Sequence, residues 1–322
     1  MDPLLPQSNR TLVPLRPYGA TGFEVSRIGL GCVTFGREID EAASFAVMDC
    51  AASYGVNLFD TAEAYGGGAS ERIVGRWLRD RKCRSSVVVQ TKVSPPHSRA
   101  HIREALLRSR GLLGVEQVDV YLLHSYDLST PLDETLAALT ESVVEGGAKV
   151  VGCSNFNVDQ MRAAEDLSRG RGYVNLRVVQ PPYSLVAREI ERGLLDYCEA
   201  KGIGVGSYSP LAAGFLTGKY LPGATTIPGG TRFDVVPGHQ AIYFTPASFT
   251  VVERMRKLST ATGVPMPRLA MGWALAQPRI DAVLAGARTP RHIENAVSAL
   301  LSPLPPELLG QMSSWTDTAV QL

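Results

Sequence analysis

Four residues of the types that move and steer protons lie at or near the ends of predicted strands: Asp60, Tyr65, Lys92 and His124. In the stretch LFDTAEAYGGG, residues 58–68, an apolar pair runs into Asp60, and Tyr65 follows just before three glycines. The pKa of a tyrosine hydroxyl in water is about 10, too high for ready proton donation at neutral pH. One ammonium at ~4 Å contributes about 4 kcal/mol at an effective dielectric constant of ~20, enough to lower that pKa by ~2–3 units.

The types of these four side chains therefore predict a division of labour. We expect Asp60 to anchor Lys92 and hold it charged. We expect Lys92 to lower the pKa of Tyr65, which then acts as a general acid on a loop that its glycines allow to turn sharply. His124 is expected to orient a carbonyl group or to share the proton. Any one of these residues alone would be interpreted as a cap or loop residue, and it is the set that indicates an active site.

Short apolar runs recur along the chain at intervals close to the length of one strand and helix unit. Six consecutive runs end in polar residues, which would meet at one end of a parallel barrel. The pattern predicts one (β/α)₈ barrel domain over residues 15–322 behind a flexible tail at 1–14, with an open doubly wound sheet as the alternative. The predicted strands are residues 27–31, 57–60, 87–92, 119–124, 149–155, 177–180, 202–209 and 281–286.

Helical patterns lie between these runs. One opens with Thr130 and Pro131, which predict a cap followed by proline at the first helical position. A long Gly- and Pro-rich stretch at about 221–245 is predicted to be a flexible loop at the barrel mouth. The other predicted helices cover residues 40–55, 70–80, 247–263 and 265–277.

Composition excludes several classes of protein. The 322-residue chain has a net charge of +1, without the basic surface that nucleic acid or an acidic membrane requires. Its five cysteines and five histidines show no metal-ligand spacing, so we expect reduced thiols and no metal site. We see neither a secretory signal nor an apolar run long enough for a transmembrane helix, and we expect a cytoplasmic protein that does not bind a membrane.

Two glycine-rich stretches imitate nucleotide-binding motifs. GLGCVTFG, residues 29–36, has Thr34 where a dinucleotide fingerprint needs its third glycine. AGFLTGKY, residues 213–220, has Ala213 in place of the first P-loop glycine and Tyr220 in place of Ser or Thr. We therefore interpret the first as a strand end, and the second as a loop that can still meet a pyrophosphate.

From about Tyr18 to Trp315 the chain resembles the aldo-keto reductase superfamily. YGATGFEVSRIGLG is similar to that family's N-terminal hairpin and first strand, and FDTAEAYGGGASERIVGRWL to its signature around the Asp and Tyr. VVVQTKV and DVYLLHSYD resemble the Lys and His segments, and VVGCSNF and VVQPPYSL resemble the segments that hold the nicotinamide carboxamide. SYSPLAAGFLTGKY and GARTPRHIEN are similar to the segments for the ring and pyrophosphate and for the adenosine end.

The resemblance implies NADP(H)-dependent interconversion of an aldehyde or ketone and its alcohol, without a metal. Arg288 favours NADP over NAD, because a guanidinium suits a 2′-phosphate. The predicted substrate contacts are Tyr65 and His124, together with Phe35 and Tyr126, whose position in loops at the barrel mouth suggests that they line a substrate pocket. The implied cofactor contacts are Gly31, Cys32, Val33, Asp60, Ser154, Asn155, Gln180, Tyr208, Ser209, Pro210, Leu211, Gly214, Lys219, Gly286, Ala287, Arg288, His292 and Asn295.

Two other functions remain open. A redox-sensing regulatory subunit of this fold would bind NADPH tightly but turn it over slowly. A lyase or isomerase that uses Lys92 as a Schiff base is disfavoured, because it leaves four residues without a role: Ser154, Asn155, Gln180 and Arg288. The substrate, a small molecule, and the oligomeric state are not readable from these residues.

Overall fold

Eight parallel strands close into a barrel in the computed structural model, which describes residues 12–223 and 226–315. Around the barrel the strands pair in the order β10-β3-β4-β5-β6-β7-β8-β9, so chain neighbours are also spatial neighbours. The predicted (β/α)₈ barrel is confirmed, and the open sheet is excluded. The strands are β3 (Ile28–Gly31), β4 (Leu58–Asp60), β5 (Val88–Val93), β6 (Val118–Leu123), β7 (Ala148–Ser154), β8 (Val178–Gln180), β9 (Gly204–Ser207) and β10 (Ala282–Gly286).

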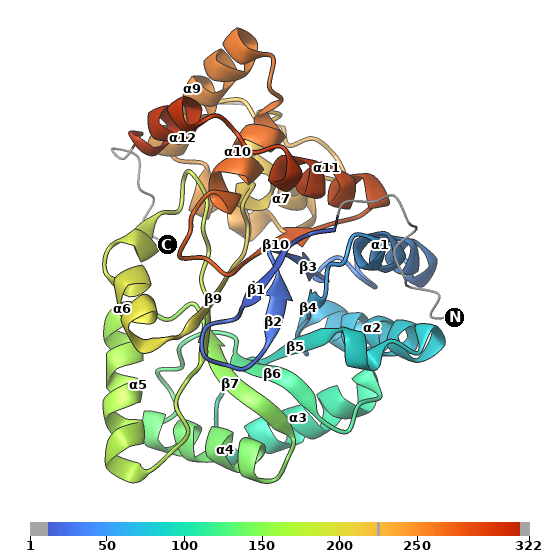
Figure 1. Ribbon diagram of the computed structural model, residues 1–322, viewed down its shortest axis with the longest axis vertical. Coiled ribbons are helices and arrows are strands. Elements are labelled where there is room, and N and C mark those ends of the chain that lie inside the picture. Colours follow the sequence, from blue (N-terminus) through green and yellow to red (C-terminus); the bar gives the residue numbers. More distant parts are fainter. Residues whose placement is uncertain (1–11, 224–225, 316–322) are drawn as a thin grey trace.

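Helices surround the ring of strands (Figure 1). Their ends follow local sequence: the Asp40 carboxylate accepts the Ala43 N–H at the start of α1, and Asn157 forms a capping box with Gln160 before α5. The helices are α1 (Glu41–Ser53), α2 (Ala69–Arg81), α3 (Arg99–Leu113), α4 (Leu132–Val144), α5 (Val158–Arg171), α6 (Leu194–Lys201), α7 (Arg232–Val235), α8 (Gln240–Tyr243), α9 (Pro246–Thr262), α10 (Met266–Leu275), α11 (Pro290–Leu301) and α12 (Pro306–Ser313).

A short antiparallel hairpin covers the amino-terminal end of the barrel and lies over the middle of the ring in Figure 1. It consists of β1 (Leu15–Pro17) and β2 (Glu24–Ser26). Its turn is tied to residues that precede strands, because the Gly19 N–H donates to Asp281 and the Ala20 N–H to the Gly202 carbonyl. The end that holds the strand C-termini is left open for a site.

The start of the chain was predicted to be a flexible tail. Residues 1–11 of that tail lie outside the described residues. Val13 is buried, and its N–H donates to the Tyr54 carbonyl, while the Pro14 carbonyl accepts the Arg27 N–H. These two residues are therefore fixed to the barrel.

One predicted helix start was wrong, and one predicted loop contains short helices. Pro131 was predicted at the first helical position, but it occupies the N-cap position, and α4 begins at Leu132. The reason is that the ψ of 133° at Pro131 is extended rather than helical. The stretch at about 221–245, predicted to be a long flexible loop, contains the short helices α7 and α8 and a 3₁₀ turn at Pro237–His239, and its residues 224–225 lie outside the described residues. Phe233 from this stretch is buried against Phe215, and both rings belong to the main hydrophobic core.

Strand alternation positions the polar residues. Residues two apart on a strand face the same side, and the barrel interior is filled by apolar side chains from the amino-terminal halves of the strands. Leu58, Val88 and Val178 belong to this interior cluster. The residue two or four positions further along each of these strands is polar, so the inward-facing positions change from apolar to polar toward the open end.

Candidate active site

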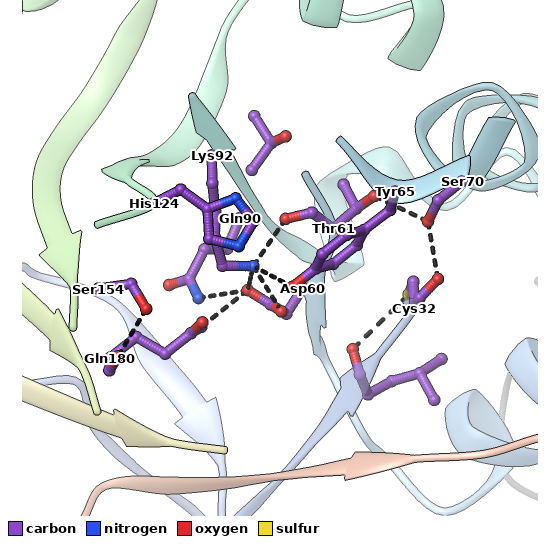
Figure 2. Close-up of polar contacts among 12 residues, drawn as sticks. Cys32, Asp60, Thr61, Tyr65, Ser70, Gln90, Lys92, His124, Ser154 and Gln180 are labelled. Atoms are coloured by element: carbon purple, nitrogen blue, oxygen red, sulfur yellow. Dashed lines mark hydrogen bonds and ion pairs between the residues drawn. The ribbon is translucent and has the colours of Figure 1, made fainter. Parts of the chain in front are cut away.

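A buried ion pair forms the centre of the site (Figure 2). The Lys92 ammonium lies 2.7 Å from each carboxylate oxygen of Asp60, with Lys92 fully buried and Asp60 3% exposed. The ammonium also donates to the Thr61 carbonyl at 2.8 Å and to the Tyr65 hydroxyl at 3.3 Å. The anchoring of Lys92 by Asp60 that the sequence predicted is therefore present, and it aims a cation at the Tyr65 oxygen.

His124 completes the group, which we call the tetrad: Asp60, Tyr65, Lys92 and His124. The imidazole follows β6 and lies edge-on to the Tyr65 ring, with ring centroids 5.7 Å apart and an interplanar angle of 76°. Tyr65 begins the 3₁₀ turn Tyr65–Gly68, in which Gly66 and Gly67 both have φ of 59°. This left-handed region favours glycine, which explains why glycines follow the tyrosine.

The pKa of Tyr65 does not follow the sequence-based expectation. Burial raises the pKa of the Tyr65 hydroxyl above its ordinary value, while the charge and hydrogen bond of Lys92 lower it without reversing the shift. The predicted fall of ~2–3 units is therefore wrong for this geometry. Tyr65 is protonated at neutral pH, the form that a proton donor needs.

Of the two nitrogen bases in the tetrad, Lys92 is charged and His124 is neutral at neutral pH. Burial opposes the charge on Lys92, but Asp60 and Tyr65 outweigh it and raise the Lys92 pKa, so the ammonium persists. Burial, and then the Lys92 charge, lower the pKa of His124 to about 4. His124 is thus a neutral imidazole at neutral pH, which can donate one hydrogen bond but has no proton to give up as an acid.

Acidification is expected to destabilise the fold through His124. Its pKa falls from 6.5 in the unfolded chain to about 4 in the folded state, so the unfolded chain binds more protons between these values. The free energy of unfolding therefore decreases as pH drops through this window. Denaturant titrations at neutral and mildly acidic pH should show a smaller pH-dependent loss for His124→Gln than for the wild type. Equal losses in the two proteins would contradict this role of the imidazole.

One cavity of about 2160 Å³ opens at the strand C-termini beside the tetrad. This volume exceeds the ~300–1,000 Å³ of a typical small-molecule pocket, so it can hold a dinucleotide together with a substrate. Asp60, Tyr65 and His124 line it, and so do all the predicted cofactor residues except Cys32.

The predicted carboxamide-binding residues are linked to one another. The Ser154 hydroxyl donates to the Gln180 carbonyl at 2.7 Å, and the Asn155 amide donates to the His124 carbonyl at 2.8 Å. The Tyr208 hydroxyl donates to the Asn155 amide oxygen at 2.7 Å. Asn155 has a φ of 61°, a left-handed conformation that asparagine tolerates better than most residues. The amide is therefore held in one orientation at the cavity wall.

A cationic region lines the cavity near the start of α11. Lys219, Arg288 and Arg291 lie on the cavity wall together with His292. Burial and then the Arg288 charge lower the pKa of Lys219, as expected where cations gather. The Arg288 guanidinium donates to the Gly230 carbonyl at 2.7 Å, and the His292 Nδ1 accepts the Arg288 N–H. This chemistry fits the phosphate groups of a dinucleotide.

Three predicted site residues lie elsewhere. Phe35, expected to contact substrate, is fully buried in the core and does not line the cavity. Tyr126 packs edge-on against Phe156 at 5.1 Å, and of these two rings only Phe156 reaches the cavity. The Cys32 side chain is fully buried, with its thiol near the Leu30 carbonyl, and Cys32 does not line the cavity.

Several residues at the site escaped the sequence reasoning. The Gln90 amide donates to Asp60 at 2.8 Å, and its signal was a polar residue two positions before Lys92 on the same strand face. Arg37 and Arg232 both pair with Glu38 at the cavity wall, at 2.6 Å and 3.2 Å. No sequence pattern marked Arg232, because it lies 194 residues from Glu38 in the chain, and the neighbouring pair Arg37 and Glu38 carried no motif.

Comparison with known proteins decides the family. The model of the "Aldo/keto reductase family" matches residues 27–316. The chain belongs to the aldo/keto reductase family. This is a family of oxidoreductases. The matched range includes the tetrad and the residues that line the cavity.

The names of its relatives include both a channel subunit and reductases. A "Probable voltage-gated potassium channel subunit beta" of Arabidopsis thaliana is 33% identical over 89% of this chain and 92% of that protein. An "L-glyceraldehyde 3-phosphate reductase" of Escherichia coli (strain K12) is 31% identical over 88% and 87%. An "NADH-specific methylglyoxal reductase" of the same organism is 31% identical over 88% and 92%.

Two further observations concern the described part of the aldo/keto reductase chain. Among residues 12–223 and 226–315, no helix is both long and apolar enough to cross a membrane. Within those same ranges no group of three His, Cys, Asp or Glu side chains is arranged to hold a metal ion.

Proposed function

We propose that this protein is an NADP(H)-dependent reductase that interconverts aldehydes or ketones, including sugar-type and secondary-metabolite carbonyls, with their alcohols. The observation that carries the proposal is the Lys92 ammonium, fixed by Asp60 and directed at a protonated Tyr65 hydroxyl on the cavity wall. A bound reduced nicotinamide supplies the hydride for carbonyl reduction.

Tyr65 is the general acid in this proposal. Its hydroxyl donates a proton to the substrate oxygen as negative charge develops there, and Lys92 stabilises the phenolate that remains. Neutral His124 donates a hydrogen bond to the same oxygen and so orients the carbonyl. Because the resting hydroxyl is protonated, the site is set for reduction, whereas alcohol oxidation needs the phenolate and should require alkaline pH.

The cofactor is assigned by the chemistry of the cavity wall. Ser154, Asn155 and Gln180 present amide and hydroxyl groups suited to a carboxamide, and Tyr208 offers an aromatic face for a ring. Lys219 and Arg288 suit phosphates. NADP differs from NAD by the 2′-phosphate on its adenosine, and we assign Arg288 to this phosphate.

Loss of the Arg288 charge is expected to change cofactor preference. Arg288→Gln keeps a donor for the Gly230 carbonyl but removes the charge, so the KM for NADPH should rise about 10–100-fold, the value of a charge-assisted hydrogen bond. The KM for NADH should change little. Steady-state kinetics with both cofactors checks this, and an equal rise for both would show that Arg288 does not read the 2′-phosphate.

The second candidate is a redox-sensing regulatory subunit that binds NADPH and turns it over slowly. It is favoured by the 33% identity to a protein named as a potassium channel beta subunit. Turnover separates the two functions: a sensor binds NADPH tightly and leaves carbonyl substrates unreduced.

We further propose that residues 15–322 form a single barrel domain and that the protein is cytoplasmic. We propose that its partners are small-molecule substrates and not nucleic acid or membranes.

A further inference from the structure

We propose that Tyr18 and Gln90 are positioning residues for proton transfer at Tyr65. They lie on the side of the tetrad that faces the barrel interior, away from the cavity. The inference rests on the proposed function, since it concerns the same proton transfer. It assigns a role to the amino-terminal hairpin, which closes the opposite end of the barrel.

A chain of hydrogen bonds runs from the hairpin to the general acid. The Tyr18 hydroxyl donates to the Gln90 amide oxygen at 3.2 Å, and the Gln90 amide nitrogen donates to Asp60 at 2.8 Å. The Asp60 carboxylate accepts the Lys92 ammonium at 2.7 Å, and this ammonium meets the Tyr65 hydroxyl at 3.3 Å. Figure 2 shows the inner part of the chain, with Gln90, Asp60 and Lys92 between the strands and Tyr65 on the loop.

The barrel is built to hold the Tyr18 ring inside it. Tyr18 is fully buried and belongs to the interior cluster. Strand β9 has glycine at the two positions that face the ring. A Cβ at Gly204 would lie 2.7 Å from the Tyr18 Cδ2 atom, and one at Gly206 would lie 2.5 Å from its hydroxyl. Any side chain at these positions would displace the ring. The two glycines of β9 therefore leave the space that the Tyr18 phenol needs to reach Gln90.

The direction of each bond in the chain follows from Asp60. A carboxylate only accepts hydrogen bonds, so Gln90 must turn its amide nitrogen toward Asp60 and its oxygen toward Tyr18. The tyrosine hydroxyl must then be the donor. Burial raises the pKa of Tyr18 well above its ordinary value, which keeps that donor protonated. Tyr18 thereby fixes the orientation of the Gln90 amide.

The orientation of this amide matters because the Asp60 carboxylate is held by several donors at once. Gln90 and Gln180 both donate to its Oδ1 atom at 2.8 Å. Without the Tyr18 hydroxyl, the Gln90 oxygen is buried without a donor, and rotation of the amide would bring that oxygen against the carboxylate. A shift of Asp60 carries Lys92 with it. The 3.3 Å contact to Tyr65 is the longest of the ammonium's hydrogen bonds and the first to weaken.

The test compares Tyr18→Phe, Gln90→Met and the double variant. Tyr18→Phe keeps the ring in place, and methionine has nearly the shape of glutamine, so both changes remove hydrogen bonds with little change of volume. We expect kcat for carbonyl reduction to fall roughly 3-fold for Tyr18→Phe and roughly 10-fold for Gln90→Met. The KM for NADPH should stay constant. The double variant should be no slower than Gln90→Met, because Tyr18 acts only through Gln90.

Tyr121→Phe is the matched control. Tyr121 is also fully buried, and its hydroxyl donates at 3.2 Å to a backbone carbonyl, that of Ile102, outside the chain of hydrogen bonds. Its loss should lower the melting temperature about as much as Tyr18→Phe but leave kcat unchanged. If Tyr18→Phe and Gln90→Met lower the melting temperature and leave kcat at the wild-type value, their role is merely structural and the proposal is overturned.

A measurement without turnover separates this inference from the proposed function. Tyrosine labelled with carbon-13 at Cζ reports the surroundings of the Tyr65 hydroxyl by NMR, with its resonance assigned by its loss in Tyr65→Phe. The resonance should shift in Tyr18→Phe and Gln90→Met and stay in place in Tyr121→Phe. An unchanged resonance in the first two variants overturns the positioning role. If the resonance shifts in these two variants but the wild type reduces no carbonyl, the proposed function alone is refuted.

Discussion

Replacing Tyr65 by phenylalanine is expected to lower kcat for carbonyl reduction by about 10³-fold, because a positioned general acid contributes ~10²–10⁴-fold. The variant keeps the aromatic ring that lies 5.7 Å from the His124 ring and loses only the hydroxyl that Lys92 contacts. The Kd for NADPH should therefore change less than about 2-fold. Steady-state kinetics and fluorescence titration of the cofactor measure the two quantities.

Each quantity has an outcome that contradicts the assignment. Loss of NADPH binding in Tyr65→Phe would show that the hydroxyl holds the cofactor. Retained kcat would show that another group donates the proton. His124 could not be that donor, because its pKa of about 4 leaves it neutral at neutral pH. The proton would then have to come from solvent. His124→Gln serves as the comparison, since it keeps a hydrogen-bond donor and should lose far less activity than Tyr65→Phe.

Lys92→Met is expected to have the largest effect on stability. It leaves the Asp60 carboxylate 3% exposed and without its cation, although the two glutamine amides still donate to it. Removing one partner of a buried ion pair costs about 3–5 kcal/mol in the free energy of unfolding. Equilibrium denaturation of the purified variant measures this loss.

The matched double variant is Asp60→Asn with Lys92→Met. It removes both charges, so it should recover most of the lost stability. It should remain inactive, because no cation then faces the Tyr65 hydroxyl to stabilise the phenolate. A double variant as unstable as Lys92→Met would show that the cost arises from packing. A double variant that regains activity would show that the tetrad does not depend on the Lys92 charge.

The strands and their polar ends were readable from sequence because each depends on local pattern. Apolar runs at regular spacing predicted all eight barrel strands, and three residues of the tetrad, Asp60, Lys92 and His124, lie at or next to the ends of those runs. The pairing of Asp60 with Lys92 followed from topology, since the carboxyl ends of neighbouring parallel strands meet.

Properties that depend on burial and long-range packing were not readable. Phe35 was placed at the mouth by its position after a strand, but the side chain turns into the core. The expected fall in the Tyr65 pKa counted the Lys92 charge and omitted desolvation, which is the larger effect. Gln90 was overlooked inside an apolar strand. Its partner Tyr18 is 72 residues away in the chain, so no local pattern connects them.

The measurement that tests the central claim most directly is nicotinamide oxidation by the purified wild type with NADPH and then NADH, against a panel of aldehydes, diketones and keto-sugars. The account predicts rapid NADPH consumption with at least one class of carbonyl, slower consumption of NADH, and alcohol formed in equal amount. Tight NADPH binding with no oxidation by any carbonyl in the panel would contradict it and favour the regulatory subunit.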